Sequence, residues 1–452
     1  MKLTRAIFLV LGALLAASGF ADEHLRSDVG HLDGLSLLDA YQAAREIDPA
    51  LAIAGFRVDG ALAKRDVARG NLFPKISLFG EWSENTVRYE RTAISQLPAQ
   101  EYPGERYGMQ LRSPLLNLRS YRELQRQTAL VDESKENLSM AEAEILSIVA
   151  QIYLSSLLAA ENLEQLKTEL AALERQLEEA SALYEKDLLP VTQVLEIQSR
   201  TDSLRADLVD ARGQVAITRE KLAQLMGFID FELMEVSERV NLSARVESAD
   251  MAAALAAQFD PATAAATQAL NAARKGVERE KSSWWPEIDF VYNSQYSDVG
   301  FDNLTSPPRS SETFAVSVRY PLFEGGSGAA RIRGAWAEFY AAQYQLEAVR
   351  RTASARARTA WVNLEIASER VQASRQAVRT AEVALDASRK AVRAGTARIT
   401  DVLLALAQSS RAKRDLNESR FQRALSWLEL ELSTGSEPGV LAAELSDGLH
   451  GR

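Results

Sequence analysis

The sequence KSSWWPEIDFVY, at Lys281–Tyr292, and the sequence RGNLFPKISLFG, at Arg69–Gly80, follow one pattern. Each has a polar lead-in typical of a helix, two bulky apolar residues, a proline, and then alternating polar and apolar positions. The two prolines, Pro74 and Pro286, are 212 residues apart. A helix that ends at a proline and continues as a strand is an uncommon junction, and its repetition indicates a duplicated unit.

Further landmarks extend the repeat along the chain. Asp48-Pro49-Ala50 recurs as Asp260-Pro261-Ala262 at the same offset of 212, and each triplet predicts an aspartate cap followed by proline at the first helical position. The offset becomes 208 where Val191–Leu195 matches Ile399–Leu403. This nearly constant offset predicts a tandem duplication of a unit of roughly 210 residues.

Each copy predicts a helix followed by a pair of strands. Helical spacing of alanine and charged residues covers 48–72 and 260–284. Alternation with one apolar and one charged face predicts half-buried strands at about 73–82, 106–114, 286–296 and 312–321. The segments 83–105 and 297–312, rich in proline, serine, asparagine and charge, are expected to be long exposed loops.

A very long helix and a returning helix complete each copy. No proline interrupts 115–189, which would form roughly 110 Å of helix. Apolar residues at alternating steps of three and four predict coiled-coil hairpins at about 115–226 and 325–434, turning at 187–191 and 394–399. The predicted fold is therefore mainly α, with two hairpin rods and a strand pair at one end of each.

These patterns give the expected division of the chain. A secretory signal peptide at 1–21 is predicted from Lys2, Arg5, the apolar run Ala6–Ala17 and the small residues that follow it. The remaining segments are an N-terminal segment at 22–34, the first repeat at 35–227, an inter-repeat segment at 228–245 expected at mid-height, the second repeat at 246–435, and a C-terminal tail at 436–452. No other run is as apolar, so any membrane insertion is expected to use strands.

Composition excludes several kinds of function. The chain has no cysteine, which rules out disulfides, thiol catalysis and cysteine-based metal sites. Its three histidines, His24, His31 and His450, lie close to the ends of the chain. The net charge of -10 argues against a nucleic-acid surface. We expect no catalytic site, no cofactor and no metal site.

Four short strands cannot close a transmembrane barrel, because such barrels begin at eight strands and unpaired edges are prohibitive in lipid. Several chains must therefore share one barrel. The alternative, a small soluble sheet, is disfavoured by the signal peptide, the one apolar face of each strand and the aromatic residues near the strand ends. The predicted membrane boundary comprises Pro74, Trp82, Trp284, Trp285 and Pro286.

The duplicated order of elements, and above all the stretch AGTARITDVL at Ala394–Leu403, resembles the outer-membrane channel-tunnels of the TolC type. The resemblance covers about Leu35–Gly435. It implies a homotrimer with a shared 12-stranded β-barrel in the cell outer membrane and a 12-helix α-barrel through the periplasm. It further implies an exit duct for type I protein secretion or drug efflux. The implied partners are outer-membrane lipid, a periplasmic adaptor (membrane fusion protein) and an inner-membrane ABC or proton-driven transporter.

The resemblance also assigns roles to particular residues. Asp401 matches an acidic ring at the closed periplasmic end, and Glu196 supplies the acid of the other copy at a different level, so trimerisation would give two carboxylate rings. The alternative is that both are ordinary charges on a helix surface. Adaptor docking would involve the tip residues Gly395, Thr396, Arg398, Asp187, Leu188 and Pro190, and the turn of the first copy lacks a glycine. The expected barrel lumen contains Lys75, Arg112, Glu287, Asp289 and Arg319.

Other functions remain possible from the residues alone. A periplasmic coiled-coil adaptor would normally have one hairpin flanked by β-rich domains, and a soluble scaffold needs neither strands nor a signal peptide. A lipid hydrolase or another enzyme lacks any catalytic constellation. Gly325-Gly326-Ser327-Gly328 lacks the lysine and glycine spacing of a phosphate-binding loop, which favours a flexible strand-to-helix joint. The exported cargo is open.

Overall fold

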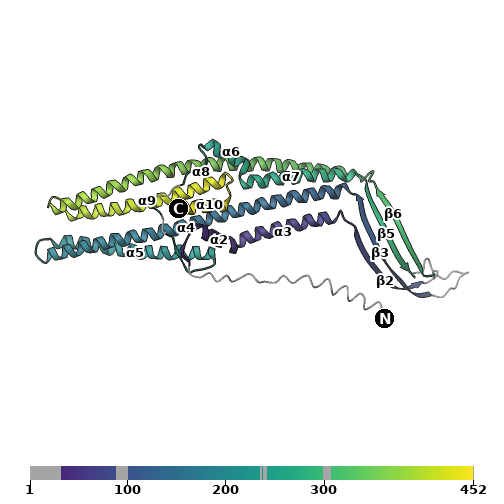
Figure 1. Cartoon of the computed structure of the whole chain (residues 1–452), viewed down its shortest axis with the longest axis horizontal. Coiled ribbons are helices and arrows are strands. Elements are labelled where there is room, and N and C mark those ends of the chain that lie inside the picture. The colour runs from purple at the N-terminus through teal and green to yellow at the C-terminus, as the bar shows by residue number, and fades with distance from the viewer. Residues whose placement is uncertain (1–31, 88–99, 235–236, 238–241, 299–306, 451–452) are drawn as a thin grey trace.

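A computed structural model describes residues 32–87, 100–234, 237, 242–298 and 307–450. The chain is long and narrow: helices run along its length, both hairpin turns lie at one end, and the sheet lies at the other (Figure 1). The expected signal peptide and most of the expected N-terminal segment fall outside the described residues. The mainly helical architecture expected from the sequence is confirmed.

The two copies repeat one series of elements. The first copy consists of α2 (Leu37–Ile47), α3 (Pro49–Gly70), β2 (Lys75–Val87), β3 (Gln100–Leu116), α4 (Leu118–Tyr184) and α5 (Val191–Met226). The second consists of α6 (Ala249–Phe259), α7 (Pro261–Lys281), the short 3-10 helix η1 (Ser282–Trp284), β5 (Glu287–Ser297), β6 (Arg309–Arg319), α8 (Ser327–Arg393) and α9 (Ile399–Ser433). Helices α4 and α8 both have 67 residues.

The starts of the short helices follow from capping chemistry. Asp48 accepts hydrogen bonds from the backbone of Ala50 and Leu51 at 2.7 and 2.9 Å, and proline follows it at the first helical position. Asp260 does the same for α7. The predicted aspartate caps are therefore confirmed. Helices α2 and α6, which precede them, begin at Ser36 and Ser248 caps and were not expected from the sequence.

The four long strands form one antiparallel sheet in the order β2-β3-β5-β6, so the sheet continues across the boundary between the copies. Three strands extend further into the segments expected to be loops: pairing continues from Lys75↔Arg112 to Val87↔Gln100, and β6 begins at Arg309. The loop expectation for 83–105 was wrong at both ends, because backbone pairing continues where the side chains are polar on both faces. The residues 88–99 lie outside the described residues.

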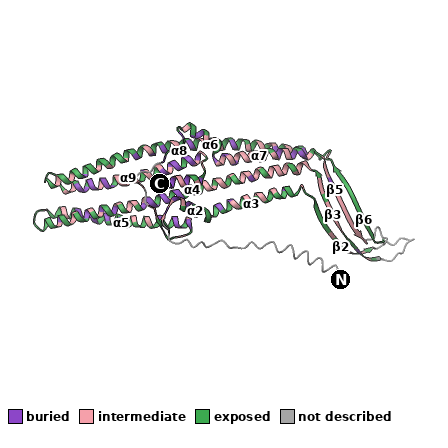
Figure 2. Ribbon diagram, viewed as in Figure 1, coloured by how far each residue is buried: buried purple, intermediate pink, exposed green. Residues whose placement is uncertain are grey.

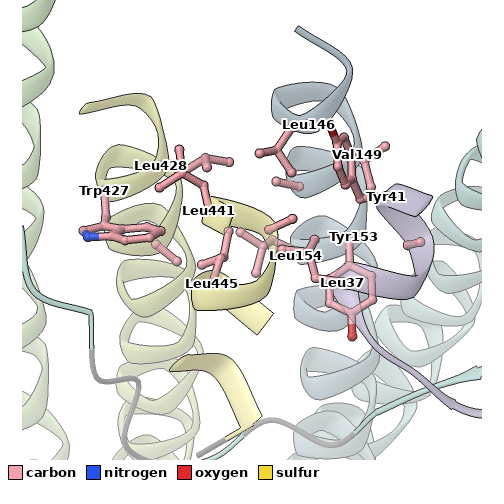
Figure 3. Packing of buried hydrophobic residues seen from close by; sticks show 14 of the residues in the cluster. Leu37, Tyr41, Leu146, Val149, Tyr153, Leu154, Trp427, Leu428, Leu441 and Leu445 are labelled. Atoms are coloured by element: carbon pink, nitrogen blue, oxygen red, sulfur yellow. The ribbon is translucent and has the colours of Figure 1, made fainter. Parts of the chain in front are cut away.

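The main core lies at mid-length, around the C-terminus (Figure 2). Helix α10 (Pro438–His450) lies between α9 and α4, with Leu441 and Leu445 between Trp427 on one side and Leu154 on the other (Figure 3). The segment expected to be a tail is therefore a core helix. A short parallel pair, β1 (Leu32–Leu35) and β4 (Phe231–Leu233), closes the same region.

Helix α4 contains an apolar stretch that contradicts one sequence expectation. By length and composition, one 18-residue window of this helix could cross a membrane, and 50% of that window is buried inside the chain. Ile145, Leu146, Val149 and Leu154 belong to the mid-length core. The buried half of this window serves helix packing, and the expectation that no comparable apolar run follows the predicted signal peptide was wrong.

Candidate functional site

The sheet has two chemically different faces. Residues that are directly paired across strands share a face, and faces alternate along each strand. The pairs Lys75↔Arg112, Arg112↔Val291 and Glu287↔Arg319 therefore place the five residues expected in the lumen on one face. Arg112 and Asp289 also form an ion pair at 2.5 Å across β3 and β5.

The opposite face is apolar over most of its length. The pairs Ile76↔Leu111, Leu111↔Tyr292 and Tyr292↔Phe314 form one row across all four strands. The rings of Tyr292 and Phe314 are 4.6 Å apart, and those of Tyr107 and Tyr296 are 4.9 Å apart. Side chains such as Leu78 and Phe314 are exposed in the single chain, with 80% and 69% of their surface open. An apolar sheet face of this size requires a partner or a lipid surface.

Tryptophans lie near both ends of this sheet. Trp284 and Trp285 precede Pro286 at the helix end of β5, and Trp285 is 56% exposed. Trp82 is 70% exposed and lies seven residues after Lys75 on β2, nearer the far end of the strands. Pro74 and Pro286 each separate a helix from a strand, as the sequence pattern predicted.

The two hairpin turns have the same backbone although only one contains glycine. Gly395 has a φ of 74° and Asp187, at the matching position, has a φ of 56°. In each turn the next residue donates its backbone N–H five residues back: Thr396 to Ala391 and Leu188 to Leu183, both at 3.0 Å. Asp187 thus adopts the left-handed conformation that aspartate tolerates better than most side chains. The turns differ in side chains, not in backbone.

Replacing Gly395 with alanine should destabilise the turn by about 1–2 kcal/mol, because alanine is strained at this φ. Asp187→Ala should also destabilise its turn, whereas Asp187→Gly should leave the stability unchanged or increase it. Urea unfolding of the purified protein measures these differences. Gly213→Ala is the matched control: Gly213 lies inside α5 with no heavy atom near an added Cβ, so alanine should stabilise there by roughly 0.5–1 kcal/mol. Equal effects at Gly395 and Gly213 would contradict the assigned turn.

Asp401 lies in the first turn of α9, and Glu196 lies in the second turn of α5. Asp401 is exposed, and its carboxylate accepts a hydrogen bond from the backbone N–H of Arg398 at 3.0 Å, so it also helps to cap α9. Glu196 is exposed on α5. Leu404 and Leu195 are also exposed, at 63% and 56%. Both acids are available to a partner chain, and Asp401 has a structural role besides.

The remaining tip residues are all exposed to solvent. Leu188 is 68% exposed, Pro190 precedes α5 and Arg398 precedes α9. At the other end of α8, Gly325 and Gly326 both have positive φ, of 62° and 84°, which fits a joint between strand and helix. Among the described residues, no group of three or more His, Cys, Asp or Glu side chains could hold a metal ion.

No sequence pattern predicts the contact that joins the two hairpins. Glu169 of α4 has a side chain only 1% exposed, and it pairs with Arg200 of α5 at 3.4 Å and with Arg414 of α9 at 3.3 Å. Beside it, an apolar cluster includes Leu173, Ile197 and Leu403, so it too spans both hairpins. The repeats are therefore held together along their distal halves by buried charge as well as by packing.

A family model described as outer membrane efflux protein matches residues 40–228 and 252–436, one segment in each copy. The chain belongs to this family. It is 26% identical over 407 residues to the outer membrane protein TolC of Vibrio cholerae, covering 89% of this chain and 91% of that protein. It is 23% identical over 420 residues to the protease secretion protein PrtF of Dickeya chrysanthemi, covering 90% and 89%.

Solved structures agree with the family assignment. The outer membrane protein VceC of Vibrio cholerae matches with a TM-score of 0.73 at 19% identity, covering 88% of this chain and 96% of that one. Membership in the outer membrane efflux protein family confirms the resemblance drawn from the sequence and the outer-membrane location it implied. One of the solved structures that this chain resembles, OprN, is described as an outer-membrane channel; it matches with a TM-score of 0.72 at 17% identity, covering 91% of this chain and 94% of that one.

Proposed function

We propose that three copies of this chain form the outer-membrane exit duct of a tripartite export system. In this assembly the sheets close into a 12-stranded barrel, and the helices continue it as a 12-helix tunnel through the periplasm. The observation that carries the proposal is the sheet itself: one face is apolar, the other is charged, and β2 and β6 each have an unpaired edge. Such edges are prohibitive in lipid unless they pair with the next copy.

The helices offer matching lateral edges for this closure. Helix order follows strand order, since α3 contacts α4, α4 contacts α7 and α7 contacts α8. The edge of α3 that faces away from α4 carries an exposed stripe: Ile53, Phe56, Gly60, Ala63 and Val67. The edge of α8 that faces away from α7 carries mostly small exposed residues: Ala330, Gly334, Ala337, Ala341, Tyr344 and Ala348. Both stripes alternate steps of three and four, the spacing of a helix pair.

The two stripes also match in height. Phe56 lies about 21 Å from the sheet end of α3, and Ala341 lies about 21 Å from the sheet end of α8. Bulky residues on α3 would therefore meet small residues on the α8 of the next copy. Below mid-length the free edges are α5, with exposed Val209 and Ile217, and α8, with exposed Ile366 and Val383. A lateral apolar edge on each side of the chain favours ring closure.

In this duct the tips would meet the periplasmic adaptor, which connects to an inner-membrane ABC or proton-driven transporter. Asp401 and Glu196 would form two rings of three carboxylates at the constriction. Lys75, Arg112, Glu287, Asp289 and Arg319 would face the barrel lumen, while Trp82, Trp284 and Trp285 would lie at the membrane surfaces. An adaptor or a pore-free scaffold would not need an amphipathic sheet or two apolar lateral edges.

The cargo proposed is type I secreted proteins, small molecules or both. PrtF and the alkaline protease secretion protein AprF of Pseudomonas aeruginosa are named for protease secretion, and both are relatives over about nine-tenths of this chain. Other relatives of similar identity carry names that specify no cargo. Protein export is therefore included in the proposal alongside efflux.

Conductance in planar bilayers tests the duct and its constriction together. The purified wild-type protein should give discrete channels that divalent cations block. Asp401→Asn with Glu196→Gln should weaken that block and increase conductance, because six carboxylates leave the constriction. Asp401→Asn also removes a carboxylate that helps to cap α9. Asp39→Asn is the control for this effect, because it removes a comparable capping carboxylate at the start of α2, far from the tips.

The possible outcomes separate the two claims. Absence of any channel activity from protein that extracts from membranes would contradict the duct. If wild type and the double variant both form channels with the same conductance and the same divalent block, the duct is supported. The two acids would then have no role at the constriction.

A further inference from the structure

The charged face of the sheet carries an excess of positive charge. Following the cross-strand pairs along the described strands, this face holds five cations and three carboxylates, which leaves two positive charges per chain. The cations are Lys75, Arg106, Arg112, Arg309 and Arg319, and the carboxylates are Glu81, Glu287 and Asp289. The charges of the two signs on this face therefore do not cancel.

Three of the five cations lie beside a carboxylate on a neighbouring strand, and the other two do not. Arg112 pairs with Asp289 at 2.5 Å and Arg106 with Glu81 at 3.2 Å, and Glu287 lies directly opposite Arg319 in the register of β5 and β6. Lys75 donates only to the neutral side-chain oxygen of Asn71, at 2.8 Å. Within the described chain, neither Lys75 nor Arg309 contacts a carboxylate. One unpaired cation thus lies toward each end of the strands.

The opposite face has the reverse character. Its described charged residues are all carboxylates, and they lie toward the strand ends far from the helices: Glu84, Glu101, Glu105 and Glu312. The sheet therefore separates charge between its faces. The tips at the other end of the chain are acidic where the proposed constriction lies, at Asp401 and Glu196.

We propose that the charged face makes the exit of the duct an anion-attracting lining that binds acidic segments of a passing polypeptide. The proposal rests on the duct function, in which this face lines the barrel. Three copies would place six excess positive charges around one lumen. A polypeptide leaving the acidic constriction would then meet a lining of opposite sign, which favours the passage of acidic segments toward the exterior.

The field of these charges depends strongly on salt. The screening length is about 30 Å at 0.01 M salt and about 3 Å at 1 M. At low salt it exceeds the radius of a small barrel, so the whole lumen is positive. At high salt the effect is confined to the wall. Binding of an acidic segment should therefore disappear as the salt concentration rises, whereas an apolar attraction would remain.

Current block by a short oligoglutamate peptide tests the lining. The peptide is added to the barrel side of trimers in planar bilayers at low salt, and it should interrupt the current from that side, while oligolysine should not. Lys75→Gln with Arg309→Gln should weaken the block about tenfold or more, since focusing of this kind changes local concentrations by about 10–1000-fold. Lys167→Gln with Lys390→Gln removes the same charge about 70 Å or further away and should leave the block unchanged.

A second pair of variants adds charge instead of removing it. Ser311 and Ser310 are neighbours on β6, and their side chains lie on opposite faces because Ser311 pairs with Gln295 and Ser310 with Tyr296. Ser311→Lys should strengthen the block, and Ser310→Lys should not. Equal block in all four variants and wild type, or block that persists in 1 M salt, would overturn the lining. If no channel is observed at all, the result would instead contradict the proposed duct, on which the lining depends.

Discussion

Replacing Arg356 with methionine should destabilise the chain by about 3 kcal/mol, the lower end of the range for removing the partner of a buried charge, because Asp260 is buried although Arg356 itself is 54% exposed. Asp260, its partner, has a side chain only 1% exposed and caps α7 through the backbone of Ala262 and Thr263. The ion pair joins Arg356 Nη2 to Oδ2 of Asp260, whereas both backbone N–H groups donate to Oδ1. Without the guanidinium, a buried negative charge retains only two backbone donors.

Urea unfolding followed by tryptophan fluorescence measures this loss. Arg358→Met is the matched control, because Arg358 lies two residues further along α8 and pairs with Asp250 at 3.3 Å, where the carboxylate is 90% exposed. That pair should contribute no more than about 1 kcal/mol. Adding Asp260→Asn to Arg356→Met should restore part of the lost stability, since the amide still accepts from the backbone without a buried charge. Equal losses at Arg356 and Arg358 would show that burial of Asp260 does not matter.

The ion pair of Arg356 with Asp260 also shows which contacts the sequence alone does not predict. The repeated Asp-Pro-Ala triplets predict both caps correctly, because capping is local and its residue preferences are strong. The partner of Asp260 comes from α8, almost a hundred residues away, and no local pattern identifies it. Residue 148, at the matching position of the first copy, is isoleucine, and within the described part of the chain Asp48 bonds only the backbone of its own helix. The duplication therefore predicts the helices but not the contacts that distinguish the copies.

In the sheet and the turns, too, local patterns predict some features and miss others. Period-two alternation predicted which residues share a face, and the pairing register gives the same faces. It underestimated strand length, since polar pairs such as Glu84↔Pro103 extend the ladder without an apolar signal. At the tips, the first copy has no glycine in its turn. Asp187 instead adopts the same left-handed conformation, which composition alone does not reveal.

Phe56→Glu should prevent assembly of the proposed trimer. Phe56 is 74% exposed in the single chain and lies on the side of α3 that faces away from α4, so the substitution should not disturb the chain's own core. In the proposed ring it would lose about 1.5–3 kcal/mol of apolar burial at each of three interfaces and would place a carboxylate against the small residues of α8. Light scattering of the detergent-extracted protein and its migration without heating should change from trimer to monomer.

Two further variants locate the effect at this interface. Arg57→Glu changes the next residue of α3, which is exposed but outside the apolar stripe, and should leave the trimer intact. Ala341→Trp alters the facing stripe on α8 and should block closure from the other side, because no space remains for Phe56 of the adjacent copy. If Phe56→Glu protein remains trimeric while retaining its fold, α3 and α8 cannot be the edges that meet. The barrel edges β2 and β6 would then have to close around a different arrangement of helices.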